Sequence, residues 1–168
     1  GLAKVKVGTV AESVAGYIDQ SGKFAINPIY VFSKDFSEGL APVSSPKDEK
    51  VNMGFIDKTG KYAIEPQFIS AEGFVDGTAI VSVGDRLPGV VGLVNKAGQF
   101  VINPQYSWLW RLGQNRFSYR VGDLDGPEGL LDGQGRVVAA PQFTNLSAMG
   151  EGLIAASFGK TEAERCGY

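Results

Sequence analysis

Histidine is absent from this sequence, and cysteine occurs once, at Cys166. Without histidine, neither a Ser-His-Asp nor a Cys-His catalytic arrangement can form, and a zinc site built from histidine and cysteine is excluded as well. One cysteine cannot form a disulfide within the chain, so cysteine usage does not indicate the redox compartment. We interpret Cys166 as an incidental thiol, and we expect neither a cofactor nor a metal site.

Long apolar runs and an excess of one charge are also lacking. No stretch approaches the roughly 18 consecutive apolar residues of a membrane-spanning helix, so we expect no membrane insertion. The net charge is −2 and the isoelectric point is near 5.2. Such a balance gives no electrostatic footprint for nucleic acid, and we expect no nucleic-acid partner.

Glycine, by contrast, is abundant, with 23 residues, about twice ordinary usage. The glycines follow an internal repeat. Gly16-Tyr-Ile-Asp-Gln-Ser-Gly-Lys-Phe-Ala-Ile-Asn-Pro recurs as Gly54-Phe-Ile-Asp-Lys-Thr-Gly-Lys-Tyr-Ala-Ile-Glu-Pro, and again from Gly92 and Gly129, at steps of 38, 38 and 37 residues. Residues 1–168 therefore read as one array with units starting near 16, 54, 92 and 129, and with partial units at both ends.

The second half of each unit repeats too. Phe36-Ser-Glu-Gly-Leu-Ala aligns with Phe74-Val-Asp-Gly-Thr-Ala, whereas the third unit has Asn115 in place of the glycine. Asparagine is the residue that next best tolerates positive φ. At the ends, Gly1 has the phase of Gly39, and Gly167 has the phase of Gly16. We interpret the chain as cut from a longer array, or as an array whose end strands complete one another.

The repeated pattern predicts short strands joined by tight turns. Asp19-Gln-Ser-Gly22 is typical of a type I turn with its glycine in the left-handed region, and apolar runs flank it on both sides. The same turn is expected to end at Gly60, Gly98 and Gly135. We expect Pro28 and its equivalents to end the second strand, and Leu40–Val43 to form a third.

Three strands per unit and no helical pattern predict an all-β fold of tandem repeats. One unit cannot bury its own apolar face, so neighbouring units must stack, as an open solenoid or a closed, propeller-like ring. The expected shared core consists of recurring aromatic residues: Tyr30, Phe68, Tyr106, Phe143, Phe36 and Phe74.

These motifs resemble the WG (or KWG) repeat family, over about 157 of the 168 residues. The tryptophan that gives the family its name precedes the leading glycine, where this chain has Ala15, Met53, Val91 and Glu128. The resemblance implies a bacterial protein and, loosely, an interaction role without enzymatic activity.

The spacing of the carboxylates in the sequence does not predict a defined metal-binding or catalytic site. Asp123, Asp125 and Glu128 alternate, but their spacing does not match a calcium-binding loop, and we interpret them as an acidic surface loop. Turn chemistry explains the recurrent Asp19, Asp57 and Asp132. A glycosidase pair of carboxylates stays open as an alternative.

The third unit departs from the repeat at Trp108-Leu-Trp110-Arg111, which contains the chain's two tryptophans. Trp110 occupies the phase of Lys34, Glu72 and Ser147, which are polar. We therefore predict an exposed binding patch made of Trp108, Trp110, Arg111, Arg116 and Tyr119. The alternative is a local variation of the core, in which the two rings cover a gap beside Leu112.

The expected function is that of a non-enzymatic module that binds a protein partner. Two other interpretations stay open: a carbohydrate-binding or glycoside-processing repeat domain that uses the same aromatic patch, and a structural spacer within a larger protein. The identity of the partner and the compartment do not follow from the sequence.

Overall fold

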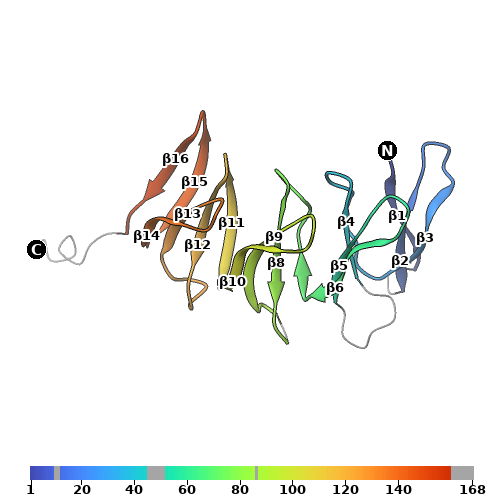
Figure 1. Cartoon of the computed structure of the whole chain (residues 1–168), viewed down its shortest axis with the longest axis horizontal. Coiled ribbons are helices and arrows are strands. Elements are labelled where there is room, and N and C mark those ends of the chain that lie inside the picture. Colours follow the sequence, from blue (N-terminus) through green and yellow to red (C-terminus); the bar gives the residue numbers. More distant parts are fainter. Residues whose placement is uncertain (10–11, 45–51, 86, 160–168) are drawn as a thin grey trace, which may run out of the picture. The chain divides into compact units, whose positions relative to one another are not determined.

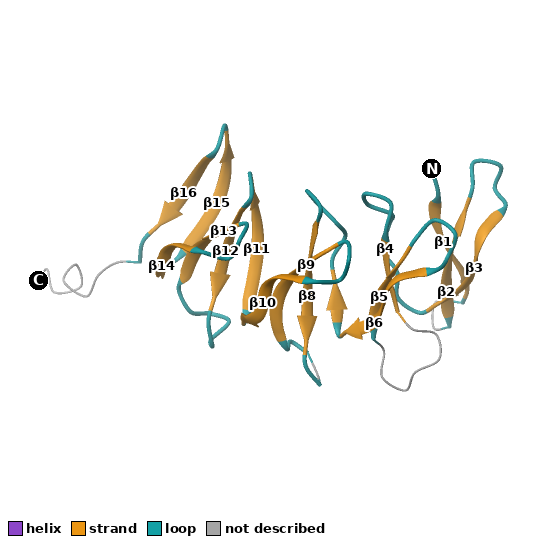
Figure 2. Cartoon of the chain, viewed as in Figure 1, coloured by secondary structure: helices purple, strands orange, loops and turns teal. Residues whose placement is uncertain are grey.

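The computed structural model describes residues 1–9, 12–44, 52–85 and 87–159. These residues form antiparallel strands and no helix, which confirms the all-β prediction (Figure 2). The chain divides into two compact units, Gly1–Pro104 and Gln105–Tyr168. Cys166 and the predicted partial repeat at Gly167 lie outside the described residues.

The first unit contains three antiparallel sheets, and β10 continues across the boundary into the second (Figure 1). Their strands are, in order, β1 (Ala3–Gly8), β2 (Ser13–Ile18) and β3 (Phe24–Tyr30); β4 (Ala41–Ser44), β5 (Met53–Ile56) and β6 (Tyr62–Phe68); and β7 (Ser70–Ala71), β8 (Thr78–Val83), β9 (Val90–Asn95) and β10 (Phe100–Tyr106).

The second unit contains a four-stranded sheet and a two-stranded one. The four-stranded sheet consists of β11 (Trp108–Gly113), β12 (Arg116–Arg120), β13 (Glu128–Asp132) and β14 (Val137–Phe143), and the two-stranded one of β15 (Asn145–Gly150) and β16 (Leu153–Ser157). The described strands form separate sheets and not a closed barrel, which confirms an array of tandem β repeats.

Each sheet is offset from the sequence repeat. The last strand of one sequence unit pairs with the hairpin that opens the next, so that Val43 on β4 lies opposite Gly54 on β5. Two sheets also gain a fourth strand. The segment after the recurring aromatic residue, Phe68 or Tyr106, forms an extra strand, β7 or β11, which pairs with the next strand along the chain. The sequence predicted only three strands, since the sequences of β7 and β11 differ so much between units.

The predicted turns are confirmed. Gly22, Gly60, Gly98 and Gly135 have φ values of 80°, 84°, 78° and 79°. In the first of these turns, Oδ1 of Asp19 accepts hydrogen bonds from the backbone N–H of Ser21 at 2.8 Å and of Lys23 at 3.2 Å. Asn115 also has a positive φ, 58°, as its replacement of glycine predicted.

The prediction that the prolines end their strands was wrong. Pro28 lies inside β3, which continues to Tyr30. The pairing of β2 with β3 shifts at this point: Tyr17 lies opposite Ile26, but Ala15 lies opposite Tyr30. The extra residues form a bulge in the edge strand, and the bulge removes the proline from the hydrogen-bonded ladder that its missing N–H would interrupt.

The core of the first unit lies between successive sheets, as stacking requires. Tyr17, Tyr30, Ala41 and Ile56 belong to one buried cluster, and a second forms around Phe55, Phe68 and Phe74. Burial of the recurring aromatics is thereby confirmed for Tyr30, Phe68 and Phe74, and Tyr106 is buried in the second unit. Phe36 and Phe143 are only half-buried.

Candidate functional site

Strand β11 places both tryptophans on one face of the sheet. Trp108 and Trp110 are two residues apart, and side chains alternate between the faces of a strand. Their rings are stacked, with centroids 6.1 Å apart and planes 5° apart. Trp110 is 59% exposed, while Trp108 is half-buried. Exposure of Trp110, inferred from its polar counterparts, is therefore confirmed, and the ring does not fill a gap in the core.

A cation lies against the inner ring of this stack. The guanidinium carbon of Arg120, which lies opposite Trp108 on β12, is 5.0 Å from the centroid of the Trp108 ring. A cation at this distance over an indole face is attracted by the ring's quadrupole. Arg120 also donates hydrogen bonds from Nη1 to the carbonyl of Leu124 and from Nη2 to Oε1 of Glu128, the latter at 2.8 Å.

Glu128 is buried, with 3% of its surface exposed, so its assignment to an acidic surface loop was wrong. Oε2 of the same carboxylate accepts a hydrogen bond of 2.9 Å from the backbone N–H of Leu146 on β15. Both carboxylate oxygens thus have partners, as burial of a charge requires. Asp123 does form a turn, since its Oδ1 accepts from the N–H of Asp125 at 3.1 Å.

A groove of about 410 Å³ separates β11 from β15, which lies alongside it (Figure 1). One wall carries the Trp108–Trp110 row. The other carries Asn145 and Ser147, whose side chains are exposed. We call this cavity the tryptophan groove. Its two walls offer a ligand flat apolar surface on one side and amide and hydroxyl groups on the other.

Two residues of the predicted patch lie on the other face of the sheet. Tyr119 is 4% exposed and packs edge-on against Tyr106, at 5.0 Å between centroids. Burial raises the pKa of its phenol. Arg111 holds its guanidinium 4.7 Å from the ring of Phe117, a buried core residue. Neither joins the tryptophan row, because positions 111 and 119 alternate with positions 110 and 118 along the paired strands.

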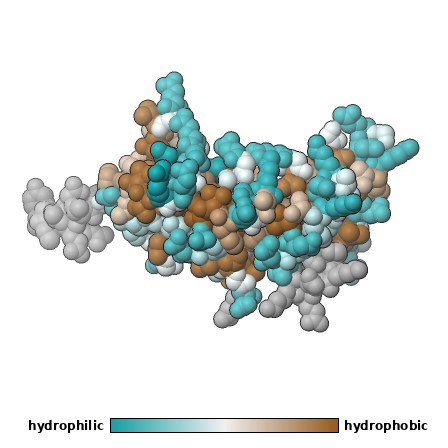
Figure 3. Space-filling view, viewed as in Figure 1, coloured by the Kyte–Doolittle hydropathy of each residue, from teal (hydrophilic) through white to brown (hydrophobic). Residues whose placement is uncertain are grey.

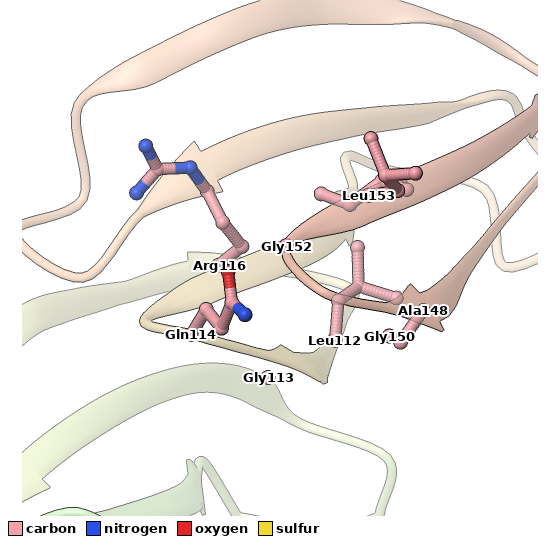
Figure 4. A pocket seen from close by; sticks show the side chains of 9 residues that line it. Leu112, Gly113, Gln114, Arg116, Ala148, Gly150, Gly152 and Leu153 are labelled. Carbon is pink, nitrogen blue, oxygen red and sulfur yellow. The ribbon is translucent and has the colours of Figure 1, made fainter.

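Arg116 lies apart from the tryptophans, at the end of the β11–β12 hairpin. It lines a smaller cavity of about 180 Å³, in which the side chains of Gln114 and Arg116 lie on one side and those of Leu112 and Leu153 on the other (Figure 4). Of the predicted patch, Trp108, Trp110 and Arg111 line the tryptophan groove, although Arg111 directs its guanidinium to Phe117, and the structure adds Arg120 and Glu128 to this lining.

The first compact unit, Gly1–Pro104, contains an equivalent groove of about 430 Å³, two repeats earlier in the sequence. Phe32 and Lys34 take the places of Trp108 and Trp110, and Ser70 faces them in the place of Asn145. Phe32 is 57% exposed, whereas Lys34 Nζ forms an ion pair of 2.5 Å with Glu72. Figure 3 shows that hydrophobic residues lie among hydrophilic ones at the surface of the chain.

The same arrangement of hairpins thus recurs along the chain, and comparison with known families agrees with it. The family model described as "WG containing repeat" matches residues 16–45, 53–86, 92–124 and 129–160. The chain belongs to the WG repeat family. No curated protein and no solved structure matches it.

Among these WG repeats, the fourth is unusual in a way that sequence reasoning missed. The position before the leading glycine is Met53 in the second repeat, and its cross-strand neighbour is Ser44. In the third repeat, Val91 lies opposite Ser82. The sheet of β11–β14, in which the fourth repeat begins, has Glu128 beside Arg120 at these two positions. A simultaneous change of both positions to opposite charges is the signal that could have revealed the pair.

The remaining chemistry of the described WG repeats is sparse. Within the described ranges, no three side chains of the His, Cys, Asp and Glu types lie close enough together to hold a metal ion. The part of the chain that the structure describes also contains no helix with the length and hydropathy that crossing a membrane requires.

Proposed function

We propose that this chain is a non-enzymatic module that binds a protein partner in the tryptophan groove, with Trp110 as the main anchor. One observation carries the proposal. Trp110 is 59% exposed and stacked on Trp108, at a position where the other repeats have Lys34, Glu72 and Ser147. A large apolar ring at a solvent-exposed phase loses the hydrophobic stabilisation that burial supplies, so a ligand that covers it gains that stabilisation.

The composition of the groove also supports a protein ligand. Tryptophan and arginine are enriched among the residues that dominate binding energy, and such anchors are surrounded by polar contacts that exclude water. Here the tryptophan row faces Asn145 and Ser147, which can satisfy the backbone N–H and C=O groups of an extended peptide.

The recurrent aspartates support the absence of catalysis. Oδ1 of Asp57 accepts hydrogen bonds from the backbone N–H of Thr59 and of Lys61. Oδ1 of Asp132 likewise accepts hydrogen bonds from the backbone N–H of Gln134 and of Arg136. Their carboxylates are therefore engaged in turns. A general acid or base must reach its substrate's proton, and these oxygens instead face the backbone of their own loops.

A carbohydrate ligand is the alternative that the groove itself favours. A flat, exposed indole beside an amide and a hydroxyl also suits a sugar ring, whose apolar face stacks on the indole while its hydroxyl groups take the hydrogen bonds. Glycoside processing would further require a pair of carboxylates at the groove, and Glu128 is committed to Arg120 and Leu146.

The test compares the wild-type chain with Trp110→Ala in two assays, a displayed library of random peptides and a glycan array. Val137→Ala is the control, because Val137 in the same unit is also 59% exposed. We expect peptides that bind the wild type and the control but bind Trp110→Ala at least about tenfold more weakly, as truncation of a dominant anchor does.

Glycan binding that is lost in Trp110→Ala, without peptide binding, would replace the protein ligand with a carbohydrate. If neither assay yields binding that depends on Trp110, the proposal is wrong and the chain is better described as a structural spacer.

A further inference from the structure

The Arg120–Glu128 pair has no role in the fold that the other repeats require. The position of Glu128 is occupied by Ala15, Met53 and Val91 in the other three units, and the second and third sheets have Ser44 and Ser82 as cross-strand neighbours there. Replacing a buried ion pair with well-packed apolar residues is often neutral or stabilising. Stability alone therefore does not account for burying two charges at this point.

The contacts of the pair lead to both walls of the tryptophan groove. On one side, Arg120 lies 5.0 Å from the Trp108 ring, on which Trp110 is stacked. On the other, Glu128 accepts the backbone N–H of Leu146, between the wall residues Asn145 and Ser147. The two side chains join to each other at 2.8 Å, with only 22% and 4% of them exposed.

We propose that Arg120 and Glu128 are positioning residues that hold the tryptophan stack and the spacing of the two groove walls in a form ready to bind. The role in binding rests on the proposed function; the positioning itself does not. The guanidinium limits the rotamers of Trp108, and the stacked Trp108 ring in turn limits those of Trp110. The carboxylate, fixed at both oxygens, ties β15 to this arrangement.

Such an arrangement strengthens binding by removing a cost. Each side chain that must be immobilised when a ligand binds reduces the affinity, and side chains that are already fixed do not. A site also needs supporting contacts to keep its ligand-contacting residues in place. The equivalent groove of the first unit differs in this respect, because Ser44 and Met53 offer no charged contact to Phe32.

The test introduces the neutral pair of the second sheet, Ser44 and Met53, into the sheet of β11–β14 as Arg120→Ser together with Glu128→Met. We expect the double variant to stay folded, because no unpaired charge is left buried, although the backbone N–H of Leu146 loses the acceptor that Glu128 supplies. The NOEs between the Trp108 and Trp110 rings should nevertheless weaken or disappear. These signals are readily assigned because the chain has only two tryptophans. Arg136→Ser is the control, since it breaks another ion pair of the same sheet, in which the arginine is exposed and the partner, Asp132, is buried.

A purely structural pair would behave differently: the double variant would retain the inter-ring NOEs whatever its Tm, and this result would overturn the proposal. Arg120→Lys provides a second measurement should the double variant fail to fold. It keeps the charge for Glu128 but removes the planar group over Trp108, so the NOEs should weaken while the fold persists; unchanged NOEs would again contradict positioning.

Peptides recovered on the wild type then test the consequence for binding. The double variant should bind them about threefold to tenfold more weakly, which corresponds to ordering one or two further side chains. Loss of the ring NOEs with undiminished peptide affinity would overturn preorganisation. If Trp110→Ala binds peptides as well as the wild type does, the proposed function fails, while the ring NOEs still decide whether Arg120 and Glu128 position the stack.

Discussion

Pro66 passes so close to Gly54 that a Cβ atom on the glycine would lie 2.8 Å from the proline nitrogen. The same hypothetical Cβ would lie 2.6 Å from the carbonyl oxygen of Ile64. Gly16 and Gly92 have equivalent neighbours, because each hairpin folds its proline bulge over the leading glycine. The recurring glycine and the recurring proline of the repeat are therefore two halves of one contact.

Gly54→Ala should consequently destabilise the chain by about 2 kcal/mol or more, since backbone atoms must move to admit the methyl group. Gly73→Ala is the control, because its Cβ would meet only the Cβ of Ser37, at an ordinary 3.4 Å. Urea unfolding of both variants measures the difference. Equal midpoints for the two variants would show that the bulge yields easily.

The turn glycines should respond for a different reason. At Gly22, φ is 80° and no atom lies within 4 Å of the position of a Cβ, so substitution there tests conformation without crowding. Gly22→Ala should cost about 1 kcal/mol, the usual penalty of the left-handed region, and Gly22→Asn should cost less. Thermal unfolding would contradict this account if alanine and asparagine proved equivalent.

Acid should weaken the aspartate turns. The hydroxyl of Thr59 and the backbone N–H groups of Thr59 and Lys61 hold the pKa of Asp57 below its usual range. A carboxyl whose folded pKa is lowered contributes stability that is present above its unfolded pKa, about 4, and lost as the pH falls through the folded pKa. Stability should therefore decline below about pH 4.

Asp57→Asn should reduce this acid dependence while keeping the turn. The third repeat already shows the substitution: Oδ1 of Asn95 accepts from the N–H groups of Ala97 and Gln99, each at 3.0 Å. Denaturant unfolding between about pH 2 and 7 measures the effect. An unchanged decline in acid would mean that other carboxylates dominate it.

Removal of the exposed tryptophan should leave the fold nearly intact. Trp110→Ala loses only a stacked contact and partial burial, so it should cost less than about 1.5 kcal/mol. Phe117→Ala, in the same sheet, removes a ring with 0% exposure and should cost about 3–5 kcal/mol. Thermal midpoints compare them directly, and a loss for Trp110 as large as that for Phe117 would place the ring in the core.

The repeat made much of the fold predictable, because turn chemistry is local. Asp19, Gly22 and Asn115 were assigned correctly from residue type and spacing alone, since positive φ and side-chain caps depend on a few neighbouring residues. Comparison of equivalent positions also predicted that Trp110 is exposed. The prolines were misjudged, because a bulge depends on the pairing of two strands and not on the proline itself.

The sequence by itself thus determined the number and phase of the repeats, the all-β class, the turns and the exposed tryptophan, all of which follow from residue type and period. Only the tertiary structure decided which residues share a face. Tyr119 is close to the tryptophans in sequence, yet the register of β11 with β12 places it opposite Leu109, on the other face from Trp108 and Trp110. From its charge alone, Glu128 is expected at the surface. Its burial is possible only because Arg120 and the backbone N–H of Leu146 donate hydrogen bonds to its carboxylate.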